Sequence, residues 1–566
     1  MKNNVSNLKK IALVILVLIA INLVSQFVFY RVDLTSDKRY TLSKTSFDII
    51  NKIQNPIYVD VFLEGNFPGE FKKLQTETQQ LLEEFKAYNP NIIYQFVNPL
   101  ENEKQRDSIL QSFALRGLTP VNVTLSDKGK QTQEVVFPWA IVTYGEKSRK
   151  IPLLKNKLGA STSEKVLSSV QHLEYAFANA FNSVSNEKSK KVGIIKGNGE
   201  MDDVYMADFI KSVRDSYGIG PFTLDSVAKN PIETLKYLKK YDLIVIAKPT
   251  ESFTDEEKQV LDQYTINGGK SIWLLDQVNM EMDSLYNQNG ANLAFPRDLN
   301  LNDLFFKYGI RINPFLIKDV QCASIALATG KQGSQTQYTE FPWLFSPLVY
   351  PIENKDASKN NPIISNLDAV KFEFANPIEG LKNNIDKTIL LQTSMYSKVV
   401  GVPVQIGLQM VGERPNVDEF KTNGNIPVAV LLEGKFNSVF ENRVLAFKDS
   451  AYKITGKSSK IIVISDGDVV KNQVDKEDQP LELGFDKWTN KQYGNKEFMM
   501  NCVNYLLDDN GLILILNKEV NLPVLDKEKV YQNYNFIGIL TIVIPLLLLI
   551  IFAFLFTFLR KKKYSK

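Results

Sequence analysis

Two long apolar runs stand near the two ends of the chain, and shorter alternating patterns fill the sequence between them. The first run covers residues 11–29 and is interrupted by only three polar residues, Asn22, Ser25 and Gln26. The second run covers residues 536–559 and carries no charge. Since a helix rises about 1.5 Å per residue, each run can cross a hydrocarbon core of about 30 Å. The pattern therefore predicts one transmembrane helix near each end.

The charges beside these runs predict how the chain crosses the membrane. Lysines precede the first run, and four basic residues, 560–563, follow the second. The positive-inside rule then places both termini in the cytoplasm and residues 31–535 in the periplasm, on the far side of a bacterial inner membrane. The alternative for the first run is a cleaved signal peptide, but its apolar stretch exceeds the usual ~7–15 residues, and no small-residue cleavage site precedes Arg31.

Polar and small residues within the two runs are candidate contacts with a membrane partner. Amide side chains can form hydrogen bonds between helices, and small or hydroxyl residues let helices approach closely. The candidates are Asn22, Ser25, Gln26, Gly538, Thr541 and Pro545. The first three share one helix face, at spacings of three and four. The same residues suit two arrangements, pairing of the two anchors with each other and docking onto a multi-span partner.

Between the anchors, the hydrophobic periodicity predicts an α/β body. Residues 57–63 alternate as a strand does, residues 70–88 repeat apolar positions on one helix face, and residues 92–97 form the next strand, which together predict a βαβ unit. Further on, short apolar strands alternate with helices from residue 191 to about 308. This alternation predicts a mostly parallel, doubly wound sheet.

The composition then changes along the chain and suggests domain boundaries. Residues 318–459 are rich in Pro, Gly and Asn and predict short strands, and an α/β pattern returns at residue 460. The predicted order is a cytoplasmic tail and first transmembrane helix (1–30), an N-terminal periplasmic α/β domain (31–185), a central α/β domain (190–317), a β-rich insertion (318–459), a returning α/β segment that completes the central domain (460–525), the second transmembrane helix (536–559) and a basic cytoplasmic tail (560–566).

The charge balance and the small number of His and Cys residues exclude several classes of function. The 566 residues include 67 Lys and Arg, 63 Asp and Glu, one His and two Cys. Eight of the basic residues lie in the two tails, so the body has 59 basic against 63 acidic groups, a balance that argues against nucleic-acid binding. One His and two distant Cys exclude a disulfide scaffold and a Cys/His zinc site. We therefore expect a non-enzymatic protein with no cofactor and no metal.

A few motifs remain as candidate chemistry. Two Gly-Lys-Ser sequences, at 269–271 and 456–458, lack the earlier glycine of a phosphate-binding loop and precede strands rather than helices. Gly197, Asn198, Gly199 and Glu200 follow a predicted strand. They form the candidate ligand turn, with a plain strand-to-helix turn as the alternative.

Two further candidates favour structural roles. Asp466 and Asp468 also follow a strand and could share a cation, but they lack the other ligands of a calcium loop, so a turn is favoured. His172 lies beside Leu173 and Tyr175, which favours a packed helix residue over a catalytic base.

The chain resembles a known family along nearly its whole length. The resemblance rests on residues 33–43, 197–200, 267–270, 341–347, 391–394, 428–436, 465–468, 483–488, 495–498 and 504–507, together with Asn501. These motifs are similar to those of the GldG family, the gliding-motility-associated ABC transporter auxiliary (substrate-binding) proteins. The resemblance implies a membrane subunit of an ABC transporter in gliding bacteria, working with a separate permease and a separate ATPase.

The resemblance also implies a fold. The family's central domain is similar to class I glutamine amidotransferases and to a module of intraflagellar-transport proteins. Those enzymes carry a Cys after a strand, whereas the corresponding positions here, 248–250 and 276–278, hold none. Relatives often have His where this chain has Asn198. The amidotransferase likeness therefore predicts the fold and not the activity.

The resulting hypothesis is an inner-membrane, doubly anchored periplasmic subunit of an ABC transporter involved in gliding motility. Residues 33–43, between anchor and body, could couple the body to the permease or could be a simple tether. The alternative function is a membrane-held periplasmic receptor for a small solute or glycan, with a pocket near Gly197, Asp276 and Asp466.

Overall fold

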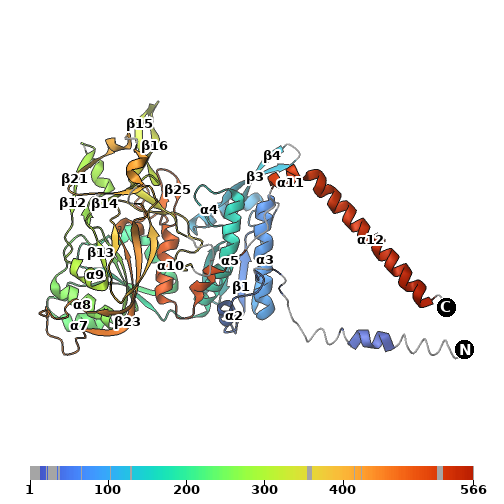
Figure 1. The fold of residues 1–566 in the computed structure, drawn as a ribbon, viewed down its shortest axis with the longest axis horizontal. Coiled ribbons are helices and arrows are strands. Elements are labelled where there is room, and N and C mark those ends of the chain that lie inside the picture. Colours follow the sequence, from blue (N-terminus) through green and yellow to red (C-terminus); the bar gives the residue numbers. More distant parts are fainter. Residues whose placement is uncertain are drawn as a thin grey trace. The chain divides into compact units, whose positions relative to one another are not determined.

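The chain forms two compact units in the computed structural model, Met1–Glu519 and Val520–Lys566. Figure 1 shows the elements of both units along the sequence. The structure describes residues 13–20, 22, 33, 35, 38–65, 67–101, 103–127, 130–287, 289–352, 360–412, 415–421, 424–518, 520 and 527–564. The mixed α/β class predicted from the sequence is confirmed.

A four-stranded sheet forms the N-terminal part of the first unit. Its strands run in the order β2-β1-β5-β6. β1 (Ile57–Val61) and β2 (Ile92–Phe96) pair in parallel, and the long helix α3 (Gly69–Tyr88) connects them. β5 (Trp139–Tyr144) and β6 (Lys147–Pro152) extend the sheet antiparallel to β1. The helix α5 (Thr162–Ser185) packs against α3 and this sheet, and its twelve buried residues include Phe177 and Phe181.

The largest sheet has seven strands in the order β19-β22-β23-β10-β9-β7-β8. The strands are β7 (Lys191–Lys196), β8 (Gly218–Thr223), β9 (Leu243–Ala247), β10 (Lys270–Leu274), β19 (Asp386–Gln392), β22 (Pro427–Asn437) and β23 (Thr455–Ile464). Five of them, from β23 to β8, run parallel, and β22 and β19 continue the sheet antiparallel. Two strands from the predicted β-rich insertion therefore belong to the central sheet.

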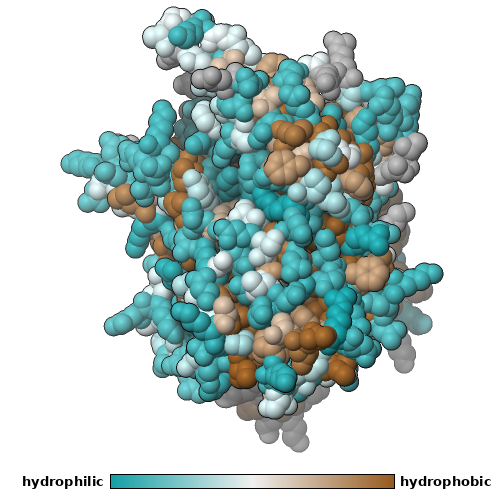
Figure 2. All heavy atoms as spheres, turned by 90° about the vertical axis from the view of Figure 1, so that its left-hand side faces the viewer, coloured by the Kyte–Doolittle hydropathy of each residue, from teal (hydrophilic) through white to brown (hydrophobic). Residues whose placement is uncertain are grey.

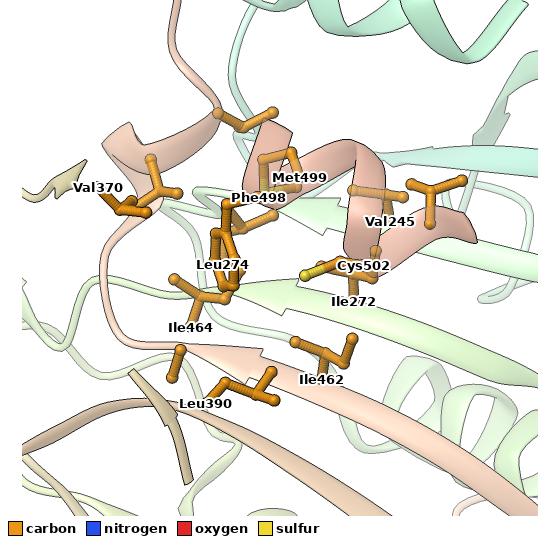
Figure 3. Close-up of a cluster of buried hydrophobic side chains, with 14 of the residues drawn as sticks. Val245, Ile272, Leu274, Val370, Leu390, Ile462, Ile464, Phe498, Met499 and Cys502 are labelled. Atoms are coloured by element: carbon orange, nitrogen blue, oxygen red, sulfur yellow. The ribbon is translucent and has the colours of Figure 1, made fainter. Parts of the chain in front are cut away.

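Helices cover both faces of this sheet. On one face, α6 (Ala207–Ser216) and α10 (Asn495–Leu507) bury their apolar residues against the strands. Figure 3 shows Phe498, Met499 and Cys502 of α10 packed over Ile272 and Ile462 of the sheet. On the other face lie α7 (Pro231–Leu238), α8 (Asp255–Ile266) and α9 (Asn302–Tyr308). Because both faces are covered, the central strand β9 is apolar throughout, and its five residues are all buried.

Shorter elements complete the first unit. They are α2 (Lys44–Ile50), α4 (Arg106–Leu115), β3 (Val121–Asp127), β4 (Lys130–Val136), β11 (Val278–Asn279), β12 (Ala291–Pro296), β13 (Ile310–Ile312), β14 (Leu316–Asp319), β15 (Cys322–Gln332), β16 (Gln335–Val349), β17 (Val370–Lys371), β18 (Ile378–Gly380), β20 (Ser397–Val400), β21 (Val404–Gly407), β24 (Phe485–Asp486) and β25 (Lys491–Gln492). Of these, β15 and β16 form a long hairpin. Figure 2 shows one face of the molecule, where hydrophilic side chains predominate and apolar ones form separate patches, as on a surface in contact with water.

The second unit contains the helices α11 (Lys527–Gln532) and α12 (Tyr534–Tyr564). By length and composition, α12 can cross a membrane. Of its candidate contacts, Thr541 uses its hydroxyl within the helix, donating to the carbonyl oxygens of Ile537 and Gly538 at 2.9 and 3.0 Å. Pro545 lies inside the helix.

The first apolar run is described only in part. Residues 13–20 and Asn22 are helical, whereas Ser25 and Gln26 lie outside the described residues. The N-terminal transmembrane helix therefore stays a prediction.

Candidate functional site

The carboxyl ends of the five parallel strands lie at one edge of the central sheet, where open α/β sheets usually bind ligands, and three of these strands lead into charged residues. The residue after β9 is Lys248, and Asp276 follows β10. Asp466 and Asp468 follow β23, the strand that returns to the sheet beside β10. Folding therefore gathers charged side chains that are more than 200 positions apart in the sequence, and it buries all four of them.

The ammonium group of Lys248 lies at the centre of these side chains. Its Nζ is 2.6 Å from Oε2 of Glu281 and 2.7 and 2.6 Å from the two carboxylate oxygens of Asp468. Oδ2 of Asp276 is 3.7 Å away. The Lys248 side chain is only 8% exposed, so these carboxylates replace its water shell. The positively charged group at this end of the sheet is therefore the Lys248 side chain itself.

The position of Lys248 depends on the local backbone conformation. Lys248 has φ 54°, in the left-handed region that non-glycine residues rarely adopt. The turn after β23 passes directly over it, and a Cβ at Gly467 would lie 2.4 Å from Cγ of Lys248. Glycine is therefore required at position 467.

The turn that contains Asp466 and Asp468 is held by backbone hydrogen bonds. Asp466 accepts from the backbone N–H groups of Asp468 and Glu373, at 2.7 and 2.5 Å. The N–H of Gly467 donates to Oδ1 of Asp276 at 2.6 Å. Asp466 thus fixes the backbone, while Asp468 turns to Lys248. The Asp466 and Asp468 carboxylates therefore have different partners, which agrees with the favoured interpretation as a turn. Across the described residues, no group of three or more His, Cys, Asp or Glu side chains could hold a metal.

Burial and neighbouring charges set the protonation of the cluster. Burial raises the pKa of Asp276 and Glu281, and burial together with the charges of Asp468 and Asp276 raises the pKa of Asp466 well above its usual value. Burial also acts to raise the pKa of Asp468, but Lys248 and Lys471 outweigh it, so this pKa is lowered. Burial acts to lower the pKa of Lys248, but the three carboxylates around it raise that pKa well above 10.5. Lys248 is therefore charged at neutral pH.

The candidate ligand turn lies beside this cluster. The backbone oxygen of Asn198 accepts hydrogen bonds from the N–H groups of Thr250 and Glu251, both at 3.0 Å, in the loop that follows Lys248. A Cβ at Gly199 would lie 2.1 Å from Oγ1 of Thr250, and Gly199 also has φ 69°, so glycine is required there. The turn is thus packed closely against the loop after β9.

Two buried oxygens of this turn have no hydrogen-bond partner among the described residues, Oδ1 of Asn198 and Oε1 of Glu200. The other oxygen of Glu200 accepts from the N–H of Asn198 at 2.8 Å, and the amide group of Asn198 donates to Glu257 at 3.1 Å. Burial raises the pKa of Glu200. These two oxygens could accept hydrogen bonds from a ligand, but the observed hydrogen bonds are those of a structural turn.

A pocket of about 580 Å³ lies elsewhere, between α9, β13 and the turn at 439–443. Its lining includes Phe306 and two ion pairs, Lys307 with Glu441 at 2.6 Å and Asp303 with Arg443 at 2.7 Å. None of its lining residues belongs to the cluster around Lys248 or to the candidate ligand turn. The prediction of a receptor pocket near Gly197, Asp276 and Asp466 gains no support from it.

The chain matches known proteins along most of its length. Residues 189–502, which hold the central sheet and the cluster around Lys248, match the family described as an ABC-type uncharacterized transport system. The chain belongs to this family. Residues 36–143 match a domain of unknown function, DUF7088. The part of the predicted resemblance that concerns ABC transport is therefore confirmed, and the link to gliding motility stays a prediction.

Two individual proteins are also similar to this chain. An uncharacterized protein of Borreliella burgdorferi is 21% identical over 570 residues, covering 99% of each chain. Among solved structures, the mmIFT52 N-terminal domain is similar with a TM-score of 0.32 and 15% identity, over 56% of this chain and 99% of that one. At this TM-score the likeness supports no conclusion about the fold.

Sequence reasoning found part of the site. It named Asp276 and Asp466 only as positions near a possible receptor pocket, and Asp466 and Asp468 as a turn that could share a cation; the structure brings Asp276 and Asp468 together at Lys248. It missed Lys248 as the common partner, and Glu281. The available signal was a lysine directly after a strand of five apolar residues, a position where burial is expected and an unpaired charge is costly.

Proposed function

We propose that the protein is a non-enzymatic, membrane-anchored subunit of an ABC transporter that works with a separate permease and a separate ATPase. The transporter serves gliding motility, the body lies in the periplasm, and both termini lie in the cytoplasm. The membership of the chain in an ABC transport family supports the first part of this proposal. The motifs shared with gliding-motility auxiliary proteins support the second.

The observation that carries the proposal is the helix α12, attached to a body of this family. Its apolar part is long enough to cross a membrane, and it ends in the basic residues Lys561, Lys562 and Lys563. By the positive-inside rule, such an end favours the cytoplasm, so the opposite end and the body attached to it favour the other side. An ATPase that acts from the cytoplasm would then need a permease to reach this body.

The environment of the nucleophiles supports a non-enzymatic role. Burial raises the pKa of the Cys322 thiol to about 11. Burial also raises the pKa of the Cys502 thiol well above 9, because this side chain of α10 packs against the sheet. A thiol reacts as the thiolate, so neither is activated. His172 is half-buried on α5, and its pKa is lowered well below 6.5 by desolvation and by Lys155. None of the three lies in the cluster around Lys248.

Affinity purification from native membranes in mild detergent tests this proposal. The tagged full-length protein is expected to recover a multi-span permease and an ABC ATPase, identified by mass spectrometry. If the polar faces of the anchors form the contact, replacing Asn22 and Gln26 together with Leu reduces this recovery, as does Gly538→Leu. Thr557→Leu, which changes a hydroxyl elsewhere on α12, is the matched control. Recovery of neither subunit by the wild-type protein would contradict the proposal.

The pocket beside α9 favours one alternative, a membrane-held receptor for a small solute or glycan. An exposed aromatic ring, Phe306, and several polar groups line a volume suited to a small ligand. A thermal-shift screen with periplasmic solutes separates the two functions, since a ligand raises the melting temperature in a saturable way. Such stabilisation, abolished by Phe306→Ala, would favour the receptor.

A further inference from the structure

Two segments far apart in the sequence meet in the first unit, one near residue 41 and one near its end. The incoming segment, from Asp33 to Ser46, follows the predicted N-terminal anchor. The outgoing segment is the short helix η8 (Leu512–Asn517) with Lys518, and the second unit begins at Val520. The Nζ of Lys518 donates a hydrogen bond to the backbone oxygen of Thr41 at 2.8 Å. Segments almost 480 positions apart are therefore in direct contact.

A carboxylate on a third element joins the two segments. Glu174 lies on α5, and its side chain is only 7% exposed. Its Oε2 accepts from Nζ of Lys518 at 2.6 Å, and its Oε1 accepts from the N–H of Ser43 at 2.7 Å and from the hydroxyl of Ser46 at 2.8 Å. We call this arrangement the Glu174–Lys518 clasp. Because a buried carboxylate needs partners, loosening one segment weakens the hold on the other.

Hydrogen bonds connect the described residues of the incoming segment. The Asp33 carboxylate accepts from the N–H of Thr35 at 2.9 Å, from the N–H of Tyr40 at 2.9 Å and from the hydroxyl of Thr41 at 3.0 Å. Burial acts to raise the pKa of Asp33, but these hydrogen bonds outweigh it and the pKa is lowered. These hydrogen bonds thus link Asp33 to Thr41, which contacts Lys518.

The clasp also leads inward to the central sheet. Tyr175, the residue after Glu174, accepts a hydrogen bond from the amide of Asn504 at 2.8 Å. Asn504 belongs to α10, which covers one face of the seven-stranded sheet. This hydrogen bond connects α5, next to the clasp, with a helix of the central core.

We propose that the Glu174–Lys518 clasp couples the two membrane-proximal segments, so that movement at one anchor changes the other segment and α5. The mechanical role rests on the proposed function, in which both ends of the body lead into the membrane. The clasp itself is a property of the folded chain. Two states of such an element, biased by one partner, are what transmission between membrane and body requires.

Hydrogen–deuterium exchange on the purified full-length protein in detergent tests the coupling. Lys518→Met removes the ammonium group and keeps most of the side-chain volume. The variant is expected to exchange at least about tenfold faster in peptides covering residues 41–50 and 512–518 together. Lys421→Met is the matched control, because it removes an exposed ion pair with Asp418 far from the clasp in sequence. Unchanged exchange in both peptides of the Lys518→Met protein would overturn the proposal.

A second variant tests transmission rather than local loosening. Asp33→Asn replaces one acceptor oxygen by a donor and disrupts the hydrogen bonds of the incoming segment. Introduced alone, Asp33→Asn is expected to raise the exchange rate of residues 512–518 about threefold or more. Introduced into the Lys518→Met protein, it is expected to cause no further increase in that rate. An equal effect in both backgrounds would overturn the coupling. Lys518→Arg, which keeps the charge, should restore transmission. These outcomes concern the purified chain, so they are independent of whether a permease is recovered from membranes.

Discussion

Replacing Lys248 with methionine removes the cation at the end of the central sheet and keeps most of the side-chain volume. The change leaves the carboxylates of Glu281, Asp468 and Asp276 without their shared partner. Glu281 is about one-third exposed and can turn toward water, whereas Asp276 and Asp468 are 8% exposed. The cost of the substitution therefore comes mainly from two buried charges.

The size of this cost follows from what remains near them. Removing one partner of a buried ion pair costs about 3–5 kcal/mol. Arg297 stays 3.9 Å from Asp276, and Lys471 stays 3.6 Å from Asp468, so part of the charge is still balanced. We expect about 3–4 kcal/mol, which lowers the melting temperature by roughly 3–4 °C for a cooperatively unfolding unit of this size.

The assay is thermal unfolding of the full-length protein in detergent at pH 8 and pH 5.5. Lys236→Met is the matched control, since Lys236 forms an exposed i,i+3 ion pair with Glu233 and its removal should cost less than about 0.5 kcal/mol. The folded-state pKa of Lys248 is raised, so its stabilisation is complete below about pH 10.5 and is lost only as the pH rises through the raised pKa. The wild-type cluster thus keeps its cation at both pH values.

The variant behaves differently with pH. Carboxylates whose folded-state pKa is raised destabilise the fold above their usual pKa, and this penalty shrinks as the pH falls and they take up protons. The difference between wild type and Lys248→Met should therefore be smaller at pH 5.5 than at pH 8. A Lys248→Met protein as stable as Lys236→Met at pH 8 would refute the account of the cluster.

Three further outcomes are expected. Gly456→Ala should destabilise the protein by about 2 kcal/mol or more in denaturant unfolding, because a Cβ there would lie 2.1 Å from the backbone oxygen of Ile266; an unchanged midpoint would show that the backbone relaxes. Ser161→Ala should cost about 1 kcal/mol by the same measurement, because it removes the capping box of α5, and no loss would mean that the cap is dispensable. In thiol titration at pH 7.5, Cys502 should resist modification until unfolding and Cys322 should react slowly; rapid reaction of Cys502 would contradict its burial.

Local patterns predicted those parts of the fold that depend on neighbouring residues. The five apolar residues of β9 indicated a buried strand before any pairing was known. Thr254 with acids in the following turn predicted the start of α8, where Thr254 accepts from the N–H of Glu257 at 3.2 Å and Glu257 accepts from the N–H of Thr254 at 2.8 Å. Both signals lie within a few residues of the structure they specify.

Features that depend on distant partners were harder to predict. β19 and β22 join the central sheet by antiparallel pairing with each other and with β23, and nothing in their Pro- and Gly-rich surroundings indicates that partner. The acids at the strand ends were visible in the sequence, but the position of Lys248 among them depends on strand order. The clasp between Glu174 and Lys518 joins residues 344 positions apart, and the hydrophobic pattern of the sequence does not predict such a contact.

The most direct test of the central claim asks on which side of the membrane the body lies. Ser334→Cys places a thiol in the exposed turn between β15 and β16, and Lys563→Cys places one at the basic end of α12, each in a chain whose native cysteines are replaced by Ala. A membrane-impermeant maleimide is applied to cells whose outer membrane has been permeabilised. The account predicts labelling of the Ser334→Cys protein, with the Lys563→Cys protein labelled only after lysis. Labelling of the Ser334→Cys protein only after lysis would place the body in the cytoplasm and contradict the account.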